Sequence, residues 1–199
     1  TGACNYDDIH RVMKLALSKT KDIVLMQCNT NYTGSLENFK YCNLNVLKQF
    51  SKDYPDTVLG LSDHTAGHST VLGSIALGAT VIEKHFTDNN SNEGPDHFFA
   101  MNPLSWRDMV DRSDELYRAL GDGIKRVEEN EKESFMVQRR AICAIKELED
   151  GHIIKEQDLT FLRPFKSGGF HPYETSSLIG KTLKQSIHQG QTILDSMVL

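Results

Sequence analysis

Apolar residues recur every three or four positions in several segments of the 199-residue chain, which is the spacing of an amphipathic helix. The first such segment follows Asn5, a residue type that caps helices. Further helices are expected over residues 36–50, 69–77 and 103–120. Short apolar runs typical of strands buried on both faces lie between them, over residues 23–28, 57–61 and 80–86. The pattern therefore predicts alternating helices and strands.

This alternation predicts an α/β fold with a parallel sheet, because parallel strands need crossover connections. A doubly wound sheet and a (β/α)₈ barrel both fit the order of the elements. The region is too short for a whole barrel, which takes about 200–250 residues. Residues 121–133 are densely charged, and short strands between turns follow from residue 140 onward. We therefore expect a second, smaller, β-rich domain after an exposed linker.

Composition narrows the classes of protein. The chain has 22 Lys and Arg against 27 Asp and Glu, whereas a nucleic-acid binder usually carries a basic stripe. No apolar run approaches the roughly 18–20 residues of a membrane span, and the start has no secretory-signal pattern. The four cysteines are far apart, which favours free thiols in a reducing compartment. We expect a cytoplasmic protein that binds neither nucleic acid nor membrane.

Polar residues end each of the three predicted strands, at residues 27–32, 62–65 and 83–87. On a parallel α/β scaffold the carboxyl ends of the strands form the rim where ligands bind. His64 and His85 hold corresponding positions, and two imidazoles on one rim can bind a transition-metal ion. Two hydrogen-bonded core histidines are the alternative interpretation, because two histidines alone make an incomplete ligand set.

Two further features of the α/β region have open roles. Glu83 shares the inward face with His85, where it could orient a ligand or form a salt bridge, and Lys84 points the opposite way. A polar loop leads to the sequence GPDH at residues 94–97, which suits either an active-site lid or a plain turn.

Ser62 and Arg163 raise two further possibilities, a nucleophile and an anion-binding arginine. Ser62 lacks the GxSxG context of a nucleophile elbow, so a serine hydrolase is not expected. In the small domain, Arg163 precedes Pro164 and a Gly-rich loop. An arginine held in this way can be presented to a carboxylate or phosphate, although a surface arginine is the plainer interpretation.

These segments, in this order, resemble the N-acylneuraminate (sialic acid) synthase family, with its legionaminic and pseudaminic acid synthase relatives. The matching stretches of the first part are LMQCNTNYTG, VLGLSDHTAG, ALGATVIEKHFTDN and GPDHFFAMNP. LEDGHIIKEQDLTFLRP, GFHPYE and LIGKTL resemble the family's antifreeze-like (SAF) domain. The resemblance implies the C-terminal half of a (β/α)₈ TIM barrel over residues 1–120, a linker over 121–137 and a small β-clip SAF domain over 138–199.

The resemblance also implies a reaction and its site. The family condenses phosphoenolpyruvate with an open-chain N-acyl hexosamine, typically N-acetylmannosamine, and releases phosphate. His64 and His85 match the ligands of a divalent cation, Mn²⁺ first and Mg²⁺ or Co²⁺ as alternatives. The matched substrate-binding positions are Thr30, Tyr32, Ser62, Asp96 and Arg163. Arg163 would reach the barrel mouth of the partner chain in a homodimer.

Two departures qualify the match, since Thr30 stands where the family commonly has Asn or Ser and Thr33 replaces the usual Pro. Thr1-Gly2 matches the middle of the family's Ser-Thr-Gly motif at the end of the fifth barrel strand. We therefore expect a C-terminal part of a synthase that is inactive alone. A metal-dependent TIM-barrel hydrolase, which normally uses more His or Asp ligands, and a non-catalytic sugar- or phosphate-binding module are the alternatives.

Overall fold

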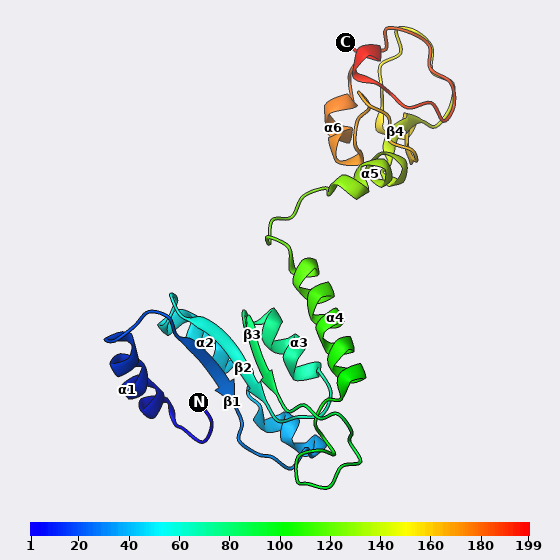
Figure 1. The fold of residues 1–199 in the computed structure, drawn as a ribbon. Coiled ribbons are helices and arrows are strands. Elements are labelled where there is room, and N and C mark those ends of the chain that lie inside the picture. Colours follow the sequence, from blue (N-terminus) through cyan, green and yellow to red (C-terminus); the bar gives the residue numbers. More distant parts are fainter. The chain divides into compact units, whose positions relative to one another are not determined.

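Three parallel strands form the sheet of the first of two units (Figure 1). The computed structural model describes residues 1–199, and the units are Thr1–Ile124 and Lys125–Leu199. The strands β1 (Val24–Cys28), β2 (Val58–Asp63) and β3 (Val81–Lys84) lie side by side in that order. Their register aligns Cys28 with Ser62 and Ser62 with Glu83, so the carboxyl ends of all three strands meet at one edge.

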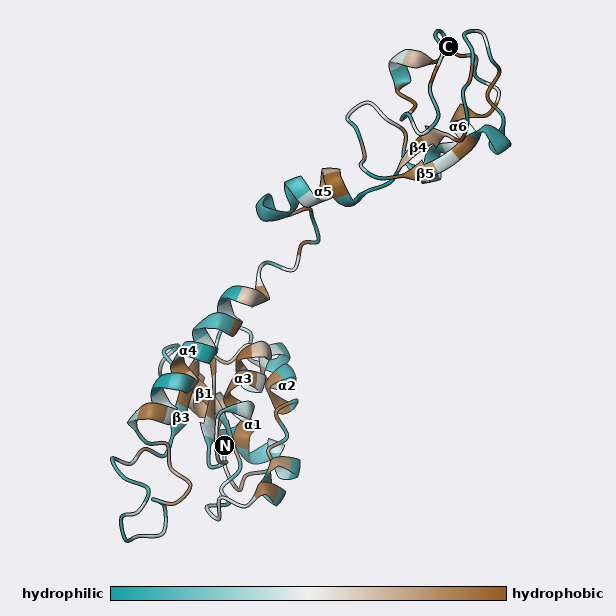
Figure 2. Cartoon of the chain, turned by 90° about the vertical axis from the view of Figure 1, so that its right-hand side faces the viewer, coloured by the Kyte–Doolittle hydropathy of each residue, from teal (hydrophilic) through white to brown (hydrophobic).

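Four α-helices connect and flank these strands: α1 (Tyr6–Leu17), α2 (Val46–Asp53), α3 (Ser69–Ala76) and α4 (Pro103–Leu120). Asn5 caps α1 and Asn102 caps α4, each with a capping box that satisfies free backbone amides. Figure 2 shows hydrophobic and hydrophilic positions alternating along the turns of α4. The single helix predicted over residues 36–50 is wrong, because Asn43 has a φ of 45° that separates the 3₁₀ helix η1 (Leu36–Tyr41) from α2.

Only one face of the sheet is covered. Leu25 and Leu59 pack with Leu47 and Phe50 of α2 in one core cluster, and Leu61 joins a second cluster with residues of α3 and α4. The opposite face leaves three valines between 37% and 45% exposed: Val24, its register partner Val58, and Val81, whose register partner is Gly60. The prediction of strands buried on both faces is therefore wrong for this chain.

The second unit is built around one antiparallel strand pair, β4 (Ala141–Ala144) with β5 (Leu159–Leu162). Five isolated bridges extend the pairing, and Ile142, Ile154 and Ile187 belong to its core. Its helical elements are η2 (Glu129–Glu131), α5 (Lys132–Gln138), η3 (Glu156–Asp158), η4 (Pro172–Glu174), α6 (Thr175–Leu178) and η5 (Asp195–Met197). None of the helices in either unit combines the length and hydropathy that a bilayer crossing requires.

Candidate active site at the carboxyl ends of the strands

Two histidines and one tyrosine form a cluster at the carboxyl edge of the sheet. His64 follows β2 and His85 follows β3, and their ring centroids lie 5.1 Å apart. Tyr32, from the loop after β1, contacts both rings, with centroid distances of 4.2 Å to His64 and 5.6 Å to His85. His64 is buried, whereas Tyr32 is 50% exposed. The structure thus brings three of the predicted site residues together beside solvent.

Each imidazole has an acceptor near its Nδ1 atom. His64 Nδ1 lies 2.9 Å from the carbonyl oxygen of Asn29, which can only accept, so this nitrogen carries the proton. His85 Nδ1 lies 3.5 Å from Asp96 Oδ2. The Asn29 contact leaves Nε2 of His64 as the ring nitrogen with a lone pair. An acceptor on the far ring nitrogen is the usual environment of a metal-binding histidine.

The donor set at this edge fits an ion that keeps open coordination positions. No group of three or more His, Cys, Asp or Glu side chains in the structure has the arrangement of a metal site. Two imidazoles can hold a divalent ion whose other positions take water or substrate oxygens, as Mn²⁺ allows. A closed structural zinc site would need four protein ligands. The residues therefore fit a catalytic ion better than a structural one.

Ser62 and Glu83 form a hydrogen-bonded pair on the open sheet face. Ser62 Oγ donates to Glu83 Oε1 at 2.7 Å, and the two residues are partners in the strand register. Each precedes its histidine by two positions, which puts all four residues on the same side of their strands. The sequence left open whether Glu83 orients a ligand or forms a salt bridge. In the structure, its carboxylate accepts a hydrogen bond from the Ser62 hydroxyl.

The loop from Thr87 to Ala100 is held against the site by its own side chains. Asn90 Nδ2 donates to the carbonyl oxygens of His97 and Ala100, both at 2.8 Å. Thr87 Oγ1 lies 2.8 Å from His97 Nδ1. Phe99 is 5% exposed and its ring centroid is 5.1 Å from that of His85. These contacts place Asp96 beside His85.

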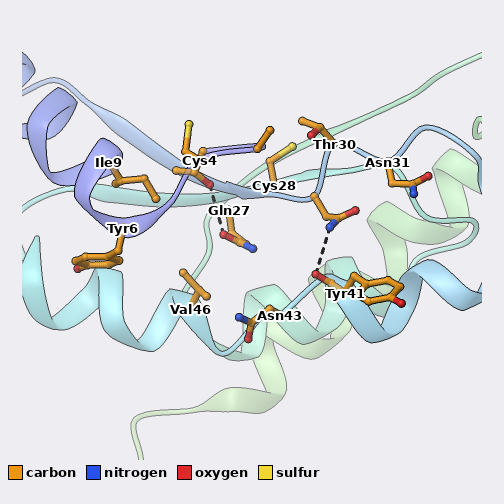
Figure 3. A pocket seen from close by; sticks show the side chains of 13 residues that line it. Cys4, Tyr6, Ile9, Gln27, Cys28, Thr30, Asn31, Tyr41, Asn43 and Val46 are labelled. Carbon is orange, nitrogen blue, oxygen red and sulfur yellow. Dashed lines mark hydrogen bonds between the residues drawn. The ribbon is translucent and has the colours of Figure 1, made fainter.

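Thr30 and Arg163 are the two remaining predicted site residues. Thr30 lines a cavity of about 510 Å³ beside the end of β1, together with residues of the chain start, α1, the loop after β1 and the segment leading into α2. Figure 3 shows Thr30 on one side of this cavity, with Tyr41 and Asn43 opposite. Arg163 is an exposed residue of the second unit. The roles predicted for these two residues stay predictions.

Sequence reasoning missed a buried ion pair behind the histidines. The side chains of Asp63 and Lys84 are each 2% exposed and contact one another. The sequence carried a signal for this pair. Asp63 and Lys84 each directly precede a candidate histidine, so both lie on the strand face opposite to the histidines. Burial, and after it the charge of Asp63, raises the pKa of the nearby Cys42 thiol, which disfavours its thiolate form.

Comparison with known proteins assigns the chain to a family. The NeuB family model matches residues 1–125 and the SAF domain model matches residues 139–199. The N,N'-diacetyllegionaminic acid synthase of Campylobacter jejuni is 30% identical over 196 residues, which cover 97% of this chain and 57% of that protein. The enzyme of the same name from Legionella pneumophila is 31% identical over 203 residues, or 98% of this chain and 54% of that protein.

A solved structure supports the fold. The crystal structure of a spore coat polysaccharide biosynthesis protein E from Chromobacterium violaceum matches with a TM-score of 0.71 at 23% identity, over 100% of this chain and 59% of that one. The predicted resemblance is confirmed, as is the predicted fold class of a partial TIM barrel followed by an SAF domain. The chain spans about half the length of the curated relatives that it matches.

Proposed function

Because the chain belongs to the NeuB family, we propose that it works in a nonulosonic acid synthase that condenses phosphoenolpyruvate with an open-chain N-acyl hexosamine. The observation that carries this proposal is the pair of imidazoles at the carboxyl edge of the sheet, each with an acceptor at Nδ1. Both similar curated synthases are named for a product of this class. A metal-dependent hydrolase normally uses more His or Asp ligands, and no group of three or more such side chains in the structure could hold a metal.

The first unit would supply one side of the catalytic centre. Its open sheet face exposes three valines, and β1 and β3 are both edge strands. A parallel sheet is stable when both faces are covered, so the working enzyme needs further βα units around this face. We therefore propose that the 199 residues alone have no synthase activity.

In the proposed reaction, carbon 3 of the enol phosphate attacks the aldehyde carbon of the sugar, water adds to carbon 2 and phosphate leaves. His64 and His85 would hold the divalent ion, Mn²⁺ first, which supplies Lewis-acid polarisation of the aldehyde when bound. Ser62 now donates to Glu83, and an anionic oxygen of phosphoenolpyruvate would replace that carboxylate as its acceptor. Tyr32 and Asp96 would contact the sugar.

The proposal extends to assembly and location. Arg163 would reach the barrel mouth of a partner copy in a homodimer, where its guanidinium can hydrogen-bond oxygen atoms of the sugar. Cysteines stay reduced in the cytosol, and the four cysteines of this chain are free. We therefore propose that the enzyme works in the cytoplasm.

Metal binding to the chain tests the carrying observation directly. Mn²⁺ broadens the NMR signals of nearby protons, and we expect the ring signals of His64 and His85 to broaden before those of the other six of the eight histidines. His64→Ala should remove the effect. His188→Ala is the matched control, because His188 is an exposed histidine of the second unit. Equal broadening of all exposed histidines would contradict the proposal.

Turnover needs the remainder of a barrel. The part of the Campylobacter jejuni synthase that this chain does not match can be fused in front of this chain. The fusion should release phosphate from phosphoenolpyruvate only with Mn²⁺ and an N-acyl hexosamine. His64→Ala and His85→Ala should each abolish the release. Phosphate release that survives both substitutions would refute the metal assignment. A folded fusion that retains both ligands without releasing phosphate would favour a binding module.

A further inference from the structure

Asp63 and Lys84 form a fully buried ion pair directly behind the two histidines. Asp63 is the last residue of β2, Lys84 is the last residue of β3, and the two are partners in the parallel register. Lys84 Nζ donates to Asp63 Oδ2, and both side chains are 2% exposed. The pair therefore joins the carboxyl ends of neighbouring strands at the level of the site.

The carboxylate of Asp63 is saturated with hydrogen-bond donors. Its Oδ1 accepts from the backbone amide and the hydroxyl of Thr65, at 3.0 and 2.9 Å. Its Oδ2 accepts from Thr70 Oγ1 at 2.7 Å as well as from Lys84. Thr70 lies in α3, so one carboxylate connects two strands to the helix between them.

The same network encloses His64 on both sides along the chain. Asp63 precedes His64 and Thr65 follows it, and Lys84 Nζ donates to the carbonyl oxygen of Thr65 besides contacting Asp63. Lys84 in turn directly precedes His85. One ammonium group thus contacts the side chain of the residue before His64 and the backbone of the residue after it. The same ammonium belongs to the residue that directly precedes His85.

Stability alone is a weak explanation for this arrangement. Removing two charges from water carries a large desolvation penalty, and apolar residues of similar volume often fill such a place equally well. Buried ionic groups that are retained can instead specify one conformation. The backbone that this pair holds is the backbone that sets the separation of the two histidine rings.

We propose that Asp63 and Lys84 are a positioning pair that fixes the juxtaposition of the His64 and His85 imidazoles. The pair touches neither substrate nor ion, and acts through the backbone of residues 63–65 and 84–85. The inference deepens the proposed function and rests on it, because a fixed separation of the two rings matters for an ion that both imidazoles bind.

The test uses the chain with the double substitution Asp63→Asn and Lys84→Met. Asn can still accept from the amide of Thr65, and Met fills most of the volume of Lys without a charge, so no unpaired ion is buried. The matched control is Asp111→Asn with Arg107→Met, which removes an exposed ion pair of α4 by the same two kinds of substitution.

The first readout needs no metal. In the unchanged chain, nuclear Overhauser effects should join the ring protons of His64 to those of His85 and Tyr32, whose centroids lie 5.1 and 4.2 Å from the His64 ring. The double substitution should weaken these effects while the methyl spectrum stays dispersed, and the control should not. Unchanged effects in a folded double variant would overturn the inference. If that variant does not fold, Lys84→Arg is used, because it keeps the charge in a side chain of different length and shape. It should weaken the same nuclear Overhauser effects, and unchanged effects would overturn the inference.

The second readout separates this inference from the proposed function. Titration with Mn²⁺ alone should show about ten-fold or greater loss of affinity in the double variant, the usual effect of removing a residue that orients a metal ligand. Equal affinity of the variant and the unchanged chain would count against the positioning role. Absence of Mn²⁺ binding in the unchanged chain would defeat the proposed function, and the ring contacts would still decide the role of the pair.

Discussion

Replacing Asp158 by Asn should destabilise the second unit, because this carboxylate is buried and held in its ionised form. Asp158 is 1% exposed. Its Oδ2 accepts from His152 Nε2 at 2.8 Å and from the backbone amide of Lys155 at 3.0 Å. Lys146 Nζ lies 3.1 Å from Oδ1, a charge contact without hydrogen-bond geometry. Asn keeps the shape of this group and removes its charge.

The magnitude follows from the pKa of Asp158. Burial raises it, but the hydrogen bonds from His152 and the Lys155 amide, together with the charge of Lys146, outweigh burial and lower the pKa from 3.8 to about 2. Because the folded pKa is below the unfolded one, the ionised group stabilises the fold above about pH 4, and this contribution disappears as the pH falls through about 2. A shift of this size corresponds to about 2 kcal/mol.

Hydrogen exchange read by mass spectrometry on peptides from residues 139–199 measures the opening free energy of this unit alone. At about pH 6 the Asp158→Asn variant should open with a free energy about 2 kcal/mol lower than the unchanged chain, and the difference should shrink toward about pH 2. Glu147→Gln is the control, because Glu147 also has a lowered pKa but is largely exposed and solvent-screened. A difference that is absent at about pH 6, or that persists undiminished at about pH 2, would refute the reasoning.

Three further substitutions test the packing of the first unit. Asn102→Ala removes a side chain that accepts from two backbone amides of α4, and chemical unfolding followed by tryptophan fluorescence should show a loss of about 1 kcal/mol. Gly34→Ala places a Cβ 2.6 Å from Phe99 Cβ, whereas the Cβ of Gly78→Ala meets no atom within 4 Å. Thermal unfolding should therefore show a larger loss of stability for Gly34→Ala. Equal losses of stability would contradict the contact with Phe99. Leu47→Ala, at a 0% exposed position, should cost about 2–5 kcal/mol in a urea titration, and a loss below about 1 kcal/mol would argue against the core.

Helices with clear end signals were predictable from the sequence. The range 103–120 agrees with α4 (Pro103–Leu120), because Asn102 and Pro103 favour a helix start and Gly121 favours its end. The range 36–50 was not predictable in the same way. Its apolar spacing suits one helix, but Asn43 adopts a positive φ that no spacing reveals. Local signals determine an element when its ends are marked by residue type.

The candidate site was predictable in position and only partly in content. The two histidines could be placed at one edge, because parallel strands carry their carboxyl ends to the same side of a sheet. The approach of Tyr32 to both rings and of Asp96 to His85 depends on the paths of two loops. The Asn29 carbonyl that sets the His64 proton is a backbone group, which residue type does not disclose.

Sequence by itself determined the alternation of helices and strands, the parallel sheet and the edge that carries the polar residues, because periodicity and end signals belong to single segments. Only the tertiary structure decided which sheet face is covered, which partner the buried Lys84 meets and how close the imidazoles come. These properties belong to pairs of segments 20 or more residues apart, such as Asp63 and Lys84, whose |i−j| is 21. Burial and ion pairing are therefore settled when separate elements pack against one another.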